Sequence, residues 1–432
     1  MSTTLLVGTA EMDITPPAGT KMAGNLYPRA SQGTDDPLMA KAIVLEADGV
    51  QVAYVTFDLV ALDRTLGEQM AALVSARTGI PIEAIAWSCS HTHSGPYPLP
   101  GVTPSTIEDP VPYAWRNALP ERVADCVAMA KARQAPARVY RTRDYRYDLG
   151  HNRRLRYKDG RQLNTWLLHN GEAQVQAIGA AGPIDPEVGI LGFVGLDGTM
   201  LAVLYQYALH ANAHFGIRFS GDYPAVVAAR LREHYGAQVC ALFMPGACGD
   251  QNPVRTYREI GNSLADAIIA QLTTQATPLT EITLGACRRV IEVPTRDAFA
   301  DQEARLQATQ WGADPQQFFR DSQRDLQAHP GTTIETALHA WHVGEVAFAS
   351  FPGELFVEHG LHVKADSPFP WTYPVELSQD ALGYLITRSA WEAGGYESLV
   401  ASMGRITPEG VEQMVETSLA MLRELHVAFA IP

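Results

Sequence analysis

The chain has few cysteines and few positive charges for its length. Its five cysteines, at positions 89, 126, 240, 248 and 287 of 432, are widely spaced and form no C-x-x-C pair. This pattern favours a reduced protein with mostly buried thiols over a disulfide framework. Lys and Arg number 33 against 47 Asp and Glu, so the net charge is −14. With no long basic run, this charge argues against a nucleic-acid surface and against a polybasic membrane anchor.

Long apolar runs and targeting signals are missing as well. No stretch approaches the roughly 20 apolar residues that a membrane span requires, so we expect no integral membrane segment. The opening "MSTTLLVGTAEMDITPP" has no basic n-region and is typical of a first strand, not of a signal peptide. Together with the cysteine pattern, this predicts a cytoplasmic protein. No repeat, low-complexity tract or linker divides the chain, so we expect one domain over residues 1–432.

The composition, with 46% hydrophobic and 19% charged residues, is that of an ordinary globular protein. Strand-like runs alternate with amphipathic helical segments, which predicts a mixed α/β (α+β) fold with sheets flanked by helices. Asp-Gly pairs predict the turns of two hairpins. The expected strands and hairpins are 41–58, 84–91, 188–209, 237–244, 281–294 and 335–351, and the expected helices are 64–79, a segment through 119–130, 221–236 with Asp222 as its cap, 258–274 and 408–425. The polar stretch 298–328 is helical in pattern and is the one candidate for a lid or separate layer. Strands that end in polar loops are expected to collect a site at their C-terminal ends.

The segment "WSCSHTHSGP" places two histidines at the end of a buried strand. Strand periodicity would point His91 and His93 to the same side, which suits a metal, although the turn at Gly95-Pro96 can interrupt the pleat. The alternative is a pair of core histidines bonded to the neighbouring serines. His210 also stands where a long apolar strand ends, and this favours the metal interpretation.

Other candidates carry weaker signals. His214 can share a helical face with His210, but we expect it to be a packing residue in a loop. Glu354 follows "FASFPG" at a strand-to-helix junction, where a glutamate is often only a partner of the helix dipole. A second metal constellation in "ELFVEHGLHVK" lacks the H-E-x-x-H order, so a partly solvated helix face is the preferred interpretation of Glu358, His359 and His362.

Two loops complete the candidates. "MPGACGD" (244–250) can be interpreted as a nucleophile turn around Cys248 or as a phosphate-binding loop. It matches no P-loop pattern, however, and no lysine is near. A close-approach backbone that lines a pocket is the preferred interpretation. The segment 150–161 concentrates five basic residues, which form either a solvated loop or donors to an anionic substrate or oxyanion.

Several motifs occur together and in a characteristic order. "VGTAEMDITPP", "HTHSGP", "HNRR", "LHANAH…SGDYP", "PGACGDQNP", "FPGELF" and "GYLITRSAWEAGGYE" resemble those of the neutral/alkaline, non-lysosomal ceramidases. The resemblance covers their N-terminal catalytic domain, from about residue 6 to 400, and "HTHSGP" is its most specific motif. We expect no counterpart of that family's immunoglobulin-like C-terminal domain.

The resemblance implies a set of site residues. Zn2+ would be the cofactor, with His91, His210, Glu354 and Tyr384 as its ligands. His93, Arg153 and Tyr396 would be catalytic, and Asp58 and Asp222 would orient the ligating histidines. The glycine-rich loop would contribute Gly249, Asp250 and Asn252 to the substrate pocket, although Asn252 stands where the family carries a serine.

The resemblance also implies a reaction. We expect a zinc-dependent hydrolase in which a metal-bound water cleaves an acyl bond, most simply an amide, of a small or amphiphilic molecule. An alternative is a metal-dependent lactone or ester hydrolase, or a lyase, acting on a carbohydrate-type substrate. A binding protein with a silent site is a third interpretation, and the expensive burial of ionisable groups at strand ends weighs against it. Neither the oligomeric state nor the presence of a second metal follows from the sequence.

Overall fold

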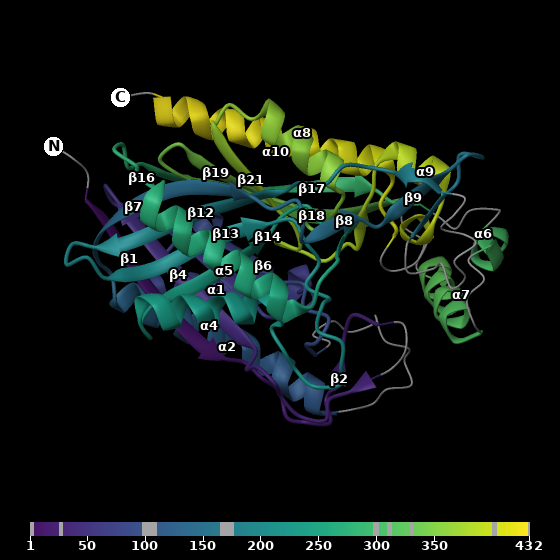
Figure 1. Cartoon of the computed structure of the whole chain (residues 1–432), viewed down its shortest axis with the longest axis horizontal. Helices are drawn as coiled ribbons and strands as arrows, with labels where there is room; N and C mark the ends of the chain where they lie inside the picture. The colour runs from purple at the N-terminus through teal and green to yellow at the C-terminus, as the bar shows by residue number, and fades with distance from the viewer. Residues whose placement is uncertain are drawn as a thin grey trace.

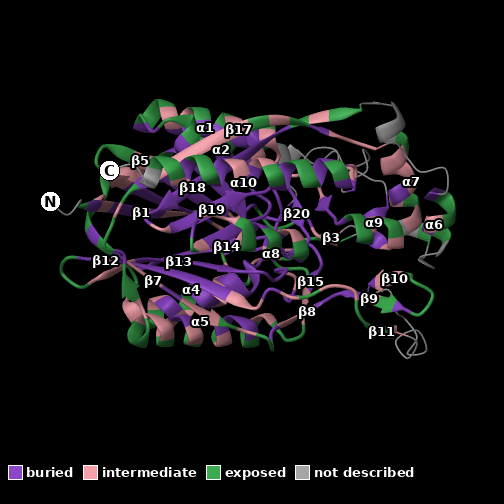
Figure 2. Ribbon diagram, turned by 90° about the horizontal axis from the view of Figure 1, so that it is seen from above, coloured by how far each residue is buried: buried purple, intermediate pink, exposed green. Residues whose placement is uncertain are grey.

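The computed structural model describes residues 4–25, 29–96, 110–164, 177–296, 302–308, 313–328, 332–399 and 404–430. Two β-sheets pack face to face, and helices cover the outer face of each sheet. Figure 1 shows α8 and α10 above the strands and α1, α2, α4 and α5 below them. Figure 2 shows the same arrangement by burial, with buried strands in the middle and exposed helix faces outside.

The larger sheet has nine strands within the described residues, in the order β14-β13-β12-β7-β1-β4-β5-β6, with β16 paired to β7. Neighbours run antiparallel except near the two edges, where β5 and β6 are parallel and β13 and β14 are parallel. The strands are β1 Leu5–Asp13, β4 Met39–Ala47, β5 Val50–Phe57, β6 Ile85–Cys89, β7 Ala135–Tyr145, β12 Glu187–Gly195, β13 Met200–Tyr207, β14 Cys240–Pro245 and β16 Thr277–Pro278.

The smaller sheet has the order β17-β18-β19-β21, and its β19 and β21 are parallel. Its strands are β17 Leu284–Pro294, β18 Thr333–Val343, β19 Val346–Ser350 and β21 Trp371–Val375. Alternate residues of the two sheets form a common core, in which Leu242 of β14 lies in one cluster with Trp341 of β18 and Phe348 of β19. The opposite faces of the same strands pack on helices, as period-two alternation requires.

The helices that cover the sheets are α1 Arg64–Thr78, α2 Pro110–Ala132, α4 Asp222–Tyr235, α5 Tyr257–Thr274, α8 Val357–Asp366 and α10 Pro408–Ala430. The shorter elements are β2 Lys21–Met22, β3 Arg29–Ala30, β8 Gly150–Asn152, β9 Arg154–Tyr157, β10 Gln162–Asn164, β11 Ala177–Ala180, β15 Gln251–Pro253, β20 Glu354–Leu355, β22 Tyr384–Leu385, α6 Gln302–Ala308, α7 Ala313–Ala328, α9 Arg388–Ala393 and two 3₁₀ turns, Ile82–Ala84 and Tyr396–Ser398.

Local sequence signals account for the boundaries of several elements. The hairpin β4–β5 turns where Asp48 and Gly49 both take positive φ, 47° and 80°, as a tight hairpin turn requires. Helix α1 begins after Asp63, whose side chain accepts a hydrogen bond from the Leu66 backbone N–H. It ends at Gly79 in the left-handed conformation, with φ 74°. These elements are therefore encoded locally.

The predicted mixed fold of sheets flanked by helices is confirmed. The described parts of the predicted helical stretch 298–328 are helical, as α6 and α7, and its other residues lie outside the described part of the chain. One correction concerns the start of α4. Asp222 does not cap α4 in the expected way, because the N-cap position is Gly221 and carries no side-chain hydrogen bond. The Asp222 backbone is instead left-handed, with φ 59°.

The two edges of the larger sheet come together near the strand ends that carry the candidate residues. Thr56 of β5 donates a hydrogen bond to the Phe243 carbonyl oxygen of β14 at 2.8 Å. This contact bridges edges that are far apart in strand order, so the segments after β6 and after β13 can meet. Converging strand ends of this kind are a usual place for a site in α/β proteins.

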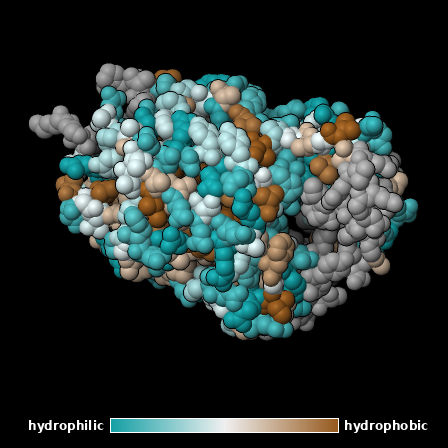
Figure 3. Space-filling model, viewed as in Figure 1, coloured by the Kyte–Doolittle hydropathy of each residue, from teal (hydrophilic) through white to brown (hydrophobic). Residues whose placement is uncertain are grey.

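Solvent exposure agrees with the composition. Figure 3 shows a face on which hydrophilic residues predominate and apolar residues form small separate groups. Of the described helices, none is both long and apolar enough to span a membrane.

All five cysteines are free; Cys287 is half-buried and the other four are buried. The predicted buried thiols are confirmed, and the cellular compartment stays a prediction.

Candidate active site

His91 lies just beyond the end of β6, where the pleat has stopped. Its backbone is left-handed, with φ 63°, an uncommon conformation for a residue with a Cβ and one that marks a constrained position. Its Nδ1 lies 2.8 Å from the Val60 carbonyl oxygen. Strand periodicity therefore does not decide which way the two histidines of "HTH" point.

The other two histidines are fixed in the same manner. His210, three residues after β13, places Nδ1 2.6 Å from the Cys248 carbonyl oxygen. His93 places Nδ1 2.7 Å from the Gly24 carbonyl oxygen. Because a carbonyl oxygen only accepts, each Nδ1 carries a proton and donates it to the backbone, and each Nε2 points away from the backbone toward the other rings.

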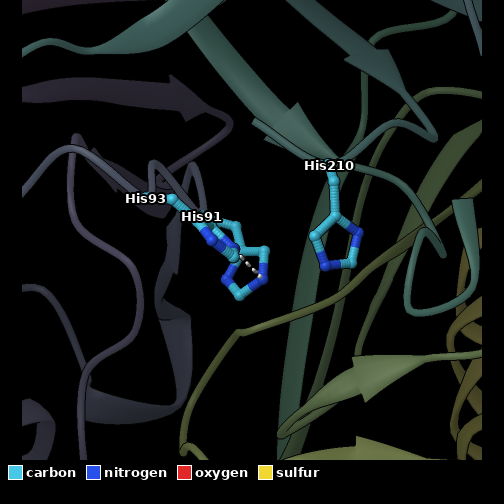
Figure 4. Close-up of side chains that lie close together, drawn as sticks. All are labelled: His91, His93 and His210. Carbon is cyan, nitrogen blue, oxygen red and sulfur yellow. Dashed lines mark hydrogen bonds between the residues drawn. The ribbon is translucent and has the colours of Figure 1, made fainter. Parts of the chain in front are cut away.

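The three rings converge, as Figure 4 shows, with His91 and His93 approaching from one side and His210 from the other. The Nε2 atoms of His91 and His93 are 3.2 Å apart. Within the described residues these three histidines form one group whose ligand atoms all lie within 4.8 Å of one another. His93 is the most exposed of the three and so faces the open side of the group.

Glu354 closes the group from the smaller sheet. It follows β19 and lies in the short strand β20, whose parallel pairing with β22 sets Glu354 directly beside Tyr384. Its Oε2 is 3.4 Å from His91 Nε2 and 3.3 Å from His210 Nε2. The same oxygen is buried and has no hydrogen-bond partner, which is costly unless another group satisfies it.

These distances fit a tetrahedral metal site. Zinc bonds of about 2.0–2.1 Å to His nitrogen and carboxylate oxygen imply ligand atoms about 3.3 Å apart at tetrahedral angles. The two distances from Glu354 Oε2, 3.4 and 3.3 Å, match this spacing. Two neutral imidazoles and one carboxylate are also a donor set that zinc prefers. The residues present therefore fit the metal that the sequence resemblance implies.

The pKa values describe the protonation of this group. Burial, reinforced by the positive charge of Arg153, lowers the pKa of His210 to about 4. Although burial raises the pKa of Glu354, His91 and His210 hold it well below its usual value. His91 differs, because Glu354 raises its pKa against the effect of burial.

The two predicted tyrosines lie beside the histidines and Glu354. The rings of Tyr384 and Tyr396 meet edge to face, with centroids 5.5 Å apart. The Arg153 guanidinium lies 5.3 Å from the centre of the Tyr384 ring. On the far side, Phe319 of α7 packs edge to face on Tyr396 at 6.0 Å. The region predicted as a lid or layer thus contacts the site through α7.

Arg153 reaches the site from the basic segment 150–161. Its Nη1 is 3.3 Å from His210 Nε2 and 3.3 Å from Asn252 Oδ1. Its Nη2 is buried without a hydrogen-bond partner. A solvated loop is therefore the wrong interpretation for this part of the segment, although Arg161 does form an exposed pair with Asp159.

A residue that the sequence reasoning missed holds Arg153 in place. Glu397 is 1% exposed and accepts from Arg153 Nε at 2.9 Å. It also pairs with Arg154 and accepts from Asn164 Nδ2 at 2.6 Å. The signal was present in the second arginine of "HNRR" and in the glutamate of "GGYE", since two buried arginines require a buried carboxylate.

The expectation for Asp58 and Asp222 is corrected by their hydrogen bonds. Asp58 Oδ2 accepts from the Met39 backbone N–H at 2.9 Å. Asp222 Oδ2 accepts from the His214 backbone N–H at 2.7 Å. The acceptors that orient the three histidines are backbone carbonyls instead, so these aspartates brace the loops behind the site.

The residues of the glycine-rich loop differ in the contacts that they make. Gly249 packs so closely on Glu354 that a Cβ would lie 2.5 Å from the Glu354 carbonyl oxygen. Asp250 is turned away from the pocket, because its carboxylate accepts from Val357 N at 3.0 Å and so caps α8. Of the three predicted pocket residues, Asn252 is the one whose side chain contacts the Arg153 guanidinium, while the Asp250 carbonyl accepts from the Arg153 backbone N–H at 2.8 Å. Cys248 is fully buried, which raises its pKa well above the usual value and disfavours a thiolate nucleophile.

The remaining histidine candidates take structural positions. His214 places Nδ1 2.9 Å from Ser94 Oγ and Nε2 3.0 Å from Asp35 Oδ2, so it ties loops together as expected of a packing residue. On α8, His362 pairs with Asp366, and both are exposed. No metal group forms there among the described residues, in agreement with a solvated helix face.

Comparison with known proteins places the fold. No protein-family model matches the chain, and no curated protein matches it in sequence. The crystal structure of neutral ceramidase from Pseudomonas aeruginosa superposes with a TM-score of 0.72 and 17% identity, over 100% of this chain and 76% of that chain. A structure of ceramidase complexed with C2 gives a TM-score of 0.73 and 17% identity, over 99% of this chain and 76% of the other. The chain therefore has the ceramidase fold, and this implication of the sequence resemblance is confirmed.

Proposed function

We propose that the protein is a zinc-dependent hydrolase that cleaves an acyl bond, most simply an amide. The observation that carries this proposal is the buried, unpartnered Glu354 Oε2, which lies 3.4 and 3.3 Å from the Nε2 atoms of His91 and His210. A carboxylate and two neutral imidazoles aimed at one point have a clear use as metal ligands. Tyr384, held beside Glu354 by the β20–β22 pairing, is the fourth residue that would hold the ion.

A zinc ion bound by these residues supplies Lewis acidity and lowers the pKa of a coordinated water toward about 7. The chain's own residues supply the rest. Arg153, with a buried unpartnered Nη2, is placed to donate a hydrogen bond to a carbonyl oxygen and to stabilise the negative charge that develops on it. Tyr396 is the second donor on the same side.

His93 is the candidate for proton transfer. Its Nδ1–H is held by the Gly24 carbonyl oxygen, and burial together with the positive charge of the neighbouring histidines lowers its pKa well below the usual value. Neutral His93 can therefore accept a proton at Nε2 and return it to the leaving amine. Its position 3.2 Å from His91 Nε2 puts it within reach of the groups that react.

The surroundings support a substrate with an apolar part. The apolar cluster around the tyrosines contains Leu306, Phe319, Phe356, Tyr384, Ile386, Ala390, Tyr396 and Leu399. This cluster lies beside the polar group of histidines and arginine, so one wall of the site is apolar and the other is ionisable. An amphiphilic N-acyl compound matches both walls. The ceramidase fold agrees with this class of substrate.

The test is metal analysis followed by a substrate panel. Purified protein is expected to retain about one zinc per chain, and to release free amine from N-acyl substrates in a zinc-dependent way. The panel includes N-acyl amides of increasing chain length, simple esters, lactones and sugar derivatives. Hydrolysis in ¹⁸O-labelled water is expected to place the label in the released acid. Products that form without label would favour a lyase, and a protein that binds no zinc would contradict the proposal.

A further inference from the structure

Glu376 is a buried carboxyl group behind the candidate site that the proposed chemistry does not use. It follows β21, and its backbone N–H donates to the Pro245 carbonyl oxygen at 3.1 Å. Its side chain is completely buried. A carboxyl group at such a position is expensive to bury, so its contacts need an account.

Both carboxyl oxygens contact the same residue of the glycine-rich loop. Oε2 accepts from the Cys248 backbone N–H at 2.9 Å, and Oε1 accepts from the Cys248 thiol at 2.8 Å. The carbonyl of that same residue accepts from His210 Nδ1 at 2.6 Å. The chain of contacts therefore runs from Glu376 through Cys248 to a proposed metal ligand.

The Cys248 carbonyl also accepts from the Gln251 backbone N–H at 2.9 Å, which holds it from the C-terminal side of the loop, whereas the Cys248 N–H and thiol are held by Glu376. The neighbouring Ala247 and Gly249 offer no polar side chain, and Gly249 is fixed only through its backbone, which donates to the Leu355 carbonyl oxygen at 2.9 Å. The two contacts from Glu376 fix both the backbone and the side chain of Cys248. A carbonyl oxygen that is fixed in this way decides which His210 nitrogen carries the proton and where the other one points.

We propose that Glu376 is a positioning residue that holds the Cys248 carbonyl, and through it the tautomer and aim of His210 Nε2. This inference rests on the zinc site of the proposed function. It does not depend on which acyl bond is cleaved, because its effect is on metal affinity.

The cost of burial supports a specific role. Burial raises the pKa of Glu376 to about 8, although His91 and the hydrogen bonds from Cys248 oppose the rise. For packing alone, an apolar side chain of the same size would be less costly. The carboxyl group offers what an apolar side chain lacks, two acceptors at the correct spacing for Cys248.

Three substitutions at one position separate acceptor geometry from packing. Glu376→Met keeps the volume and removes both acceptors. Glu376→Asp keeps the carboxyl group but shortens its reach. Glu376→Gln keeps the reach and an acceptor for the Cys248 N–H. The zinc dissociation constant of each is measured by competition with a chelator, and thermal unfolding of the zinc-free proteins serves as the check on folding.

We expect zinc affinity to fall about 10- to 100-fold in E376M and at least fivefold in E376D, the range known for groups that orient metal ligands. E376Q is expected to stay within about threefold of wild type, because it keeps an acceptor for the Cys248 N–H, whereas a purely packing role would leave E376M at wild-type affinity as well. Folded E376M with wild-type zinc affinity would overturn the inference. If E376M does not fold, E376D decides, because unchanged affinity there would overturn it equally.

The outcomes also separate this inference from the proposed function. If the wild type binds zinc but cleaves no acyl bond, the proposed function fails while Glu376 is still tested by affinity. If the wild type cleaves acyl bonds with zinc and E376M and E376D bind zinc normally, only the role of Glu376 fails. If the wild type binds no zinc, both are contradicted.

Discussion

Two pairs of buried histidines in this molecule look alike and do different things. His91 and His210 lie at strand ends, and His339 and His342 lie within β18. In both pairs a ring nitrogen contacts a backbone carbonyl, as with His339 Nε2 and the Glu83 carbonyl oxygen at 2.8 Å. Burial lowers the pKa of His339 to about 4, the same value as that of His210.

The difference lies in what the second nitrogen faces. The Nε2 atoms of His91 and His210 both face Glu354 Oε2 at 3.4 and 3.3 Å. His339 Nδ1 is buried and faces no hydrogen-bond partner within the described residues. Burial and a carbonyl partner are thus ordinary features of a core histidine. Convergence of ring nitrogens on a buried carboxylate is what distinguishes a candidate metal site.

The largest expected effect is loss of the metal on removing one converging histidine. His210→Ala is expected to weaken zinc binding about a thousandfold, because roughly 4 kcal/mol is one ligand's share of a zinc binding energy near 16 kcal/mol. The acyl hydrolase activity should fall with it. Zinc per chain after dialysis against a chelator and the dissociation constant are the measurements.

The matched control is the histidine of the other pair. His339→Gln keeps a side-chain N–H for the Glu83 carbonyl and is expected to leave zinc affinity within about twofold of wild type, since it contacts no ligand. Equal zinc loss in both variants would remove the distinction between the two pairs. Retention of zinc by folded H210A would remove His210 from the ligand set.

The second prediction concerns His339 of β18 and the pH dependence of the free energy of unfolding. The pKa of His339 is about 4 in the folded chain and about 6.5 when unfolded. Between these pH values the unfolded chain binds a proton at His339 that the folded chain does not bind. The contribution of His339 to the free energy of unfolding is therefore complete above pH 6.5 and is lost as the pH falls toward 4. The expected loss is about 3 kcal/mol over that window.

Replacing the titrating group should flatten this part of the stability profile. His339→Gln is expected to lose less stability than wild type between pH 6.5 and 4.5, as measured by urea unfolding of the zinc-free proteins. His362→Gln, which replaces an exposed histidine instead, serves as the control. Its stability profile should follow that of wild type. Parallel profiles for H339Q and wild type would show that burial does not control His339.

A third prediction separates holding the metal from holding the substrate. Glu397→Gln removes the charge that pairs with Arg153 and Arg154 and should lower kcat about 10- to 100-fold, because the donor to the developing oxyanion is no longer held. Zinc content should stay at the wild-type level, unlike in H210A. Kinetics with paired zinc analysis make the comparison.

The control for this substitution is Glu345→Gln, whose partner Arg141 lies at the surface, with the two side chains 23% and 36% exposed. That pair should be worth at most about 1 kcal/mol and should not change kcat. Loss of zinc in E397Q would place Glu397 with the metal ligands instead. Unchanged kcat in a folded E397Q would show that Arg153 needs no fixed carboxylate.

Much of the fold could be predicted because its signals are local. The Asp-Gly pair at 48–49, the glycine at 79 and the apolar alternation in β4 each act within a few residues. The stacking of two sheets could not be predicted, because each strand face is apolar whether it meets a helix or another sheet.

The features of the candidate site also divide into those that the sequence predicts and those that it does not. His91, His210 and Glu354 each follow an apolar strand, so their approximate positions could be predicted. The left-handed backbone of His91 could not, because it depends on how the loop after β6 packs. Glu376 carried no signal of its own, since it is defined by Cys248, more than a hundred residues away in sequence, and the signal for Glu397 becomes readable only when the two arginines of "HNRR" are taken to be buried.

The smallest expected effect concerns Tyr384, the ligand with the least geometric support. Burial, with the nearby Glu354, raises the pKa of Tyr384 well above its usual value, and Arg153 opposes this only in part. The phenol is therefore a weak ligand whose binding must displace a proton, and Tyr384→Phe is expected to weaken zinc binding about tenfold. Tyr205→Phe removes a buried hydroxyl that has no hydrogen-bond partner and lies on β13 within the core. It should leave zinc affinity unchanged. If the two variants bind zinc equally well, the ligand set consists of His91, His210 and Glu354 alone, and Tyr384 lines the substrate site instead.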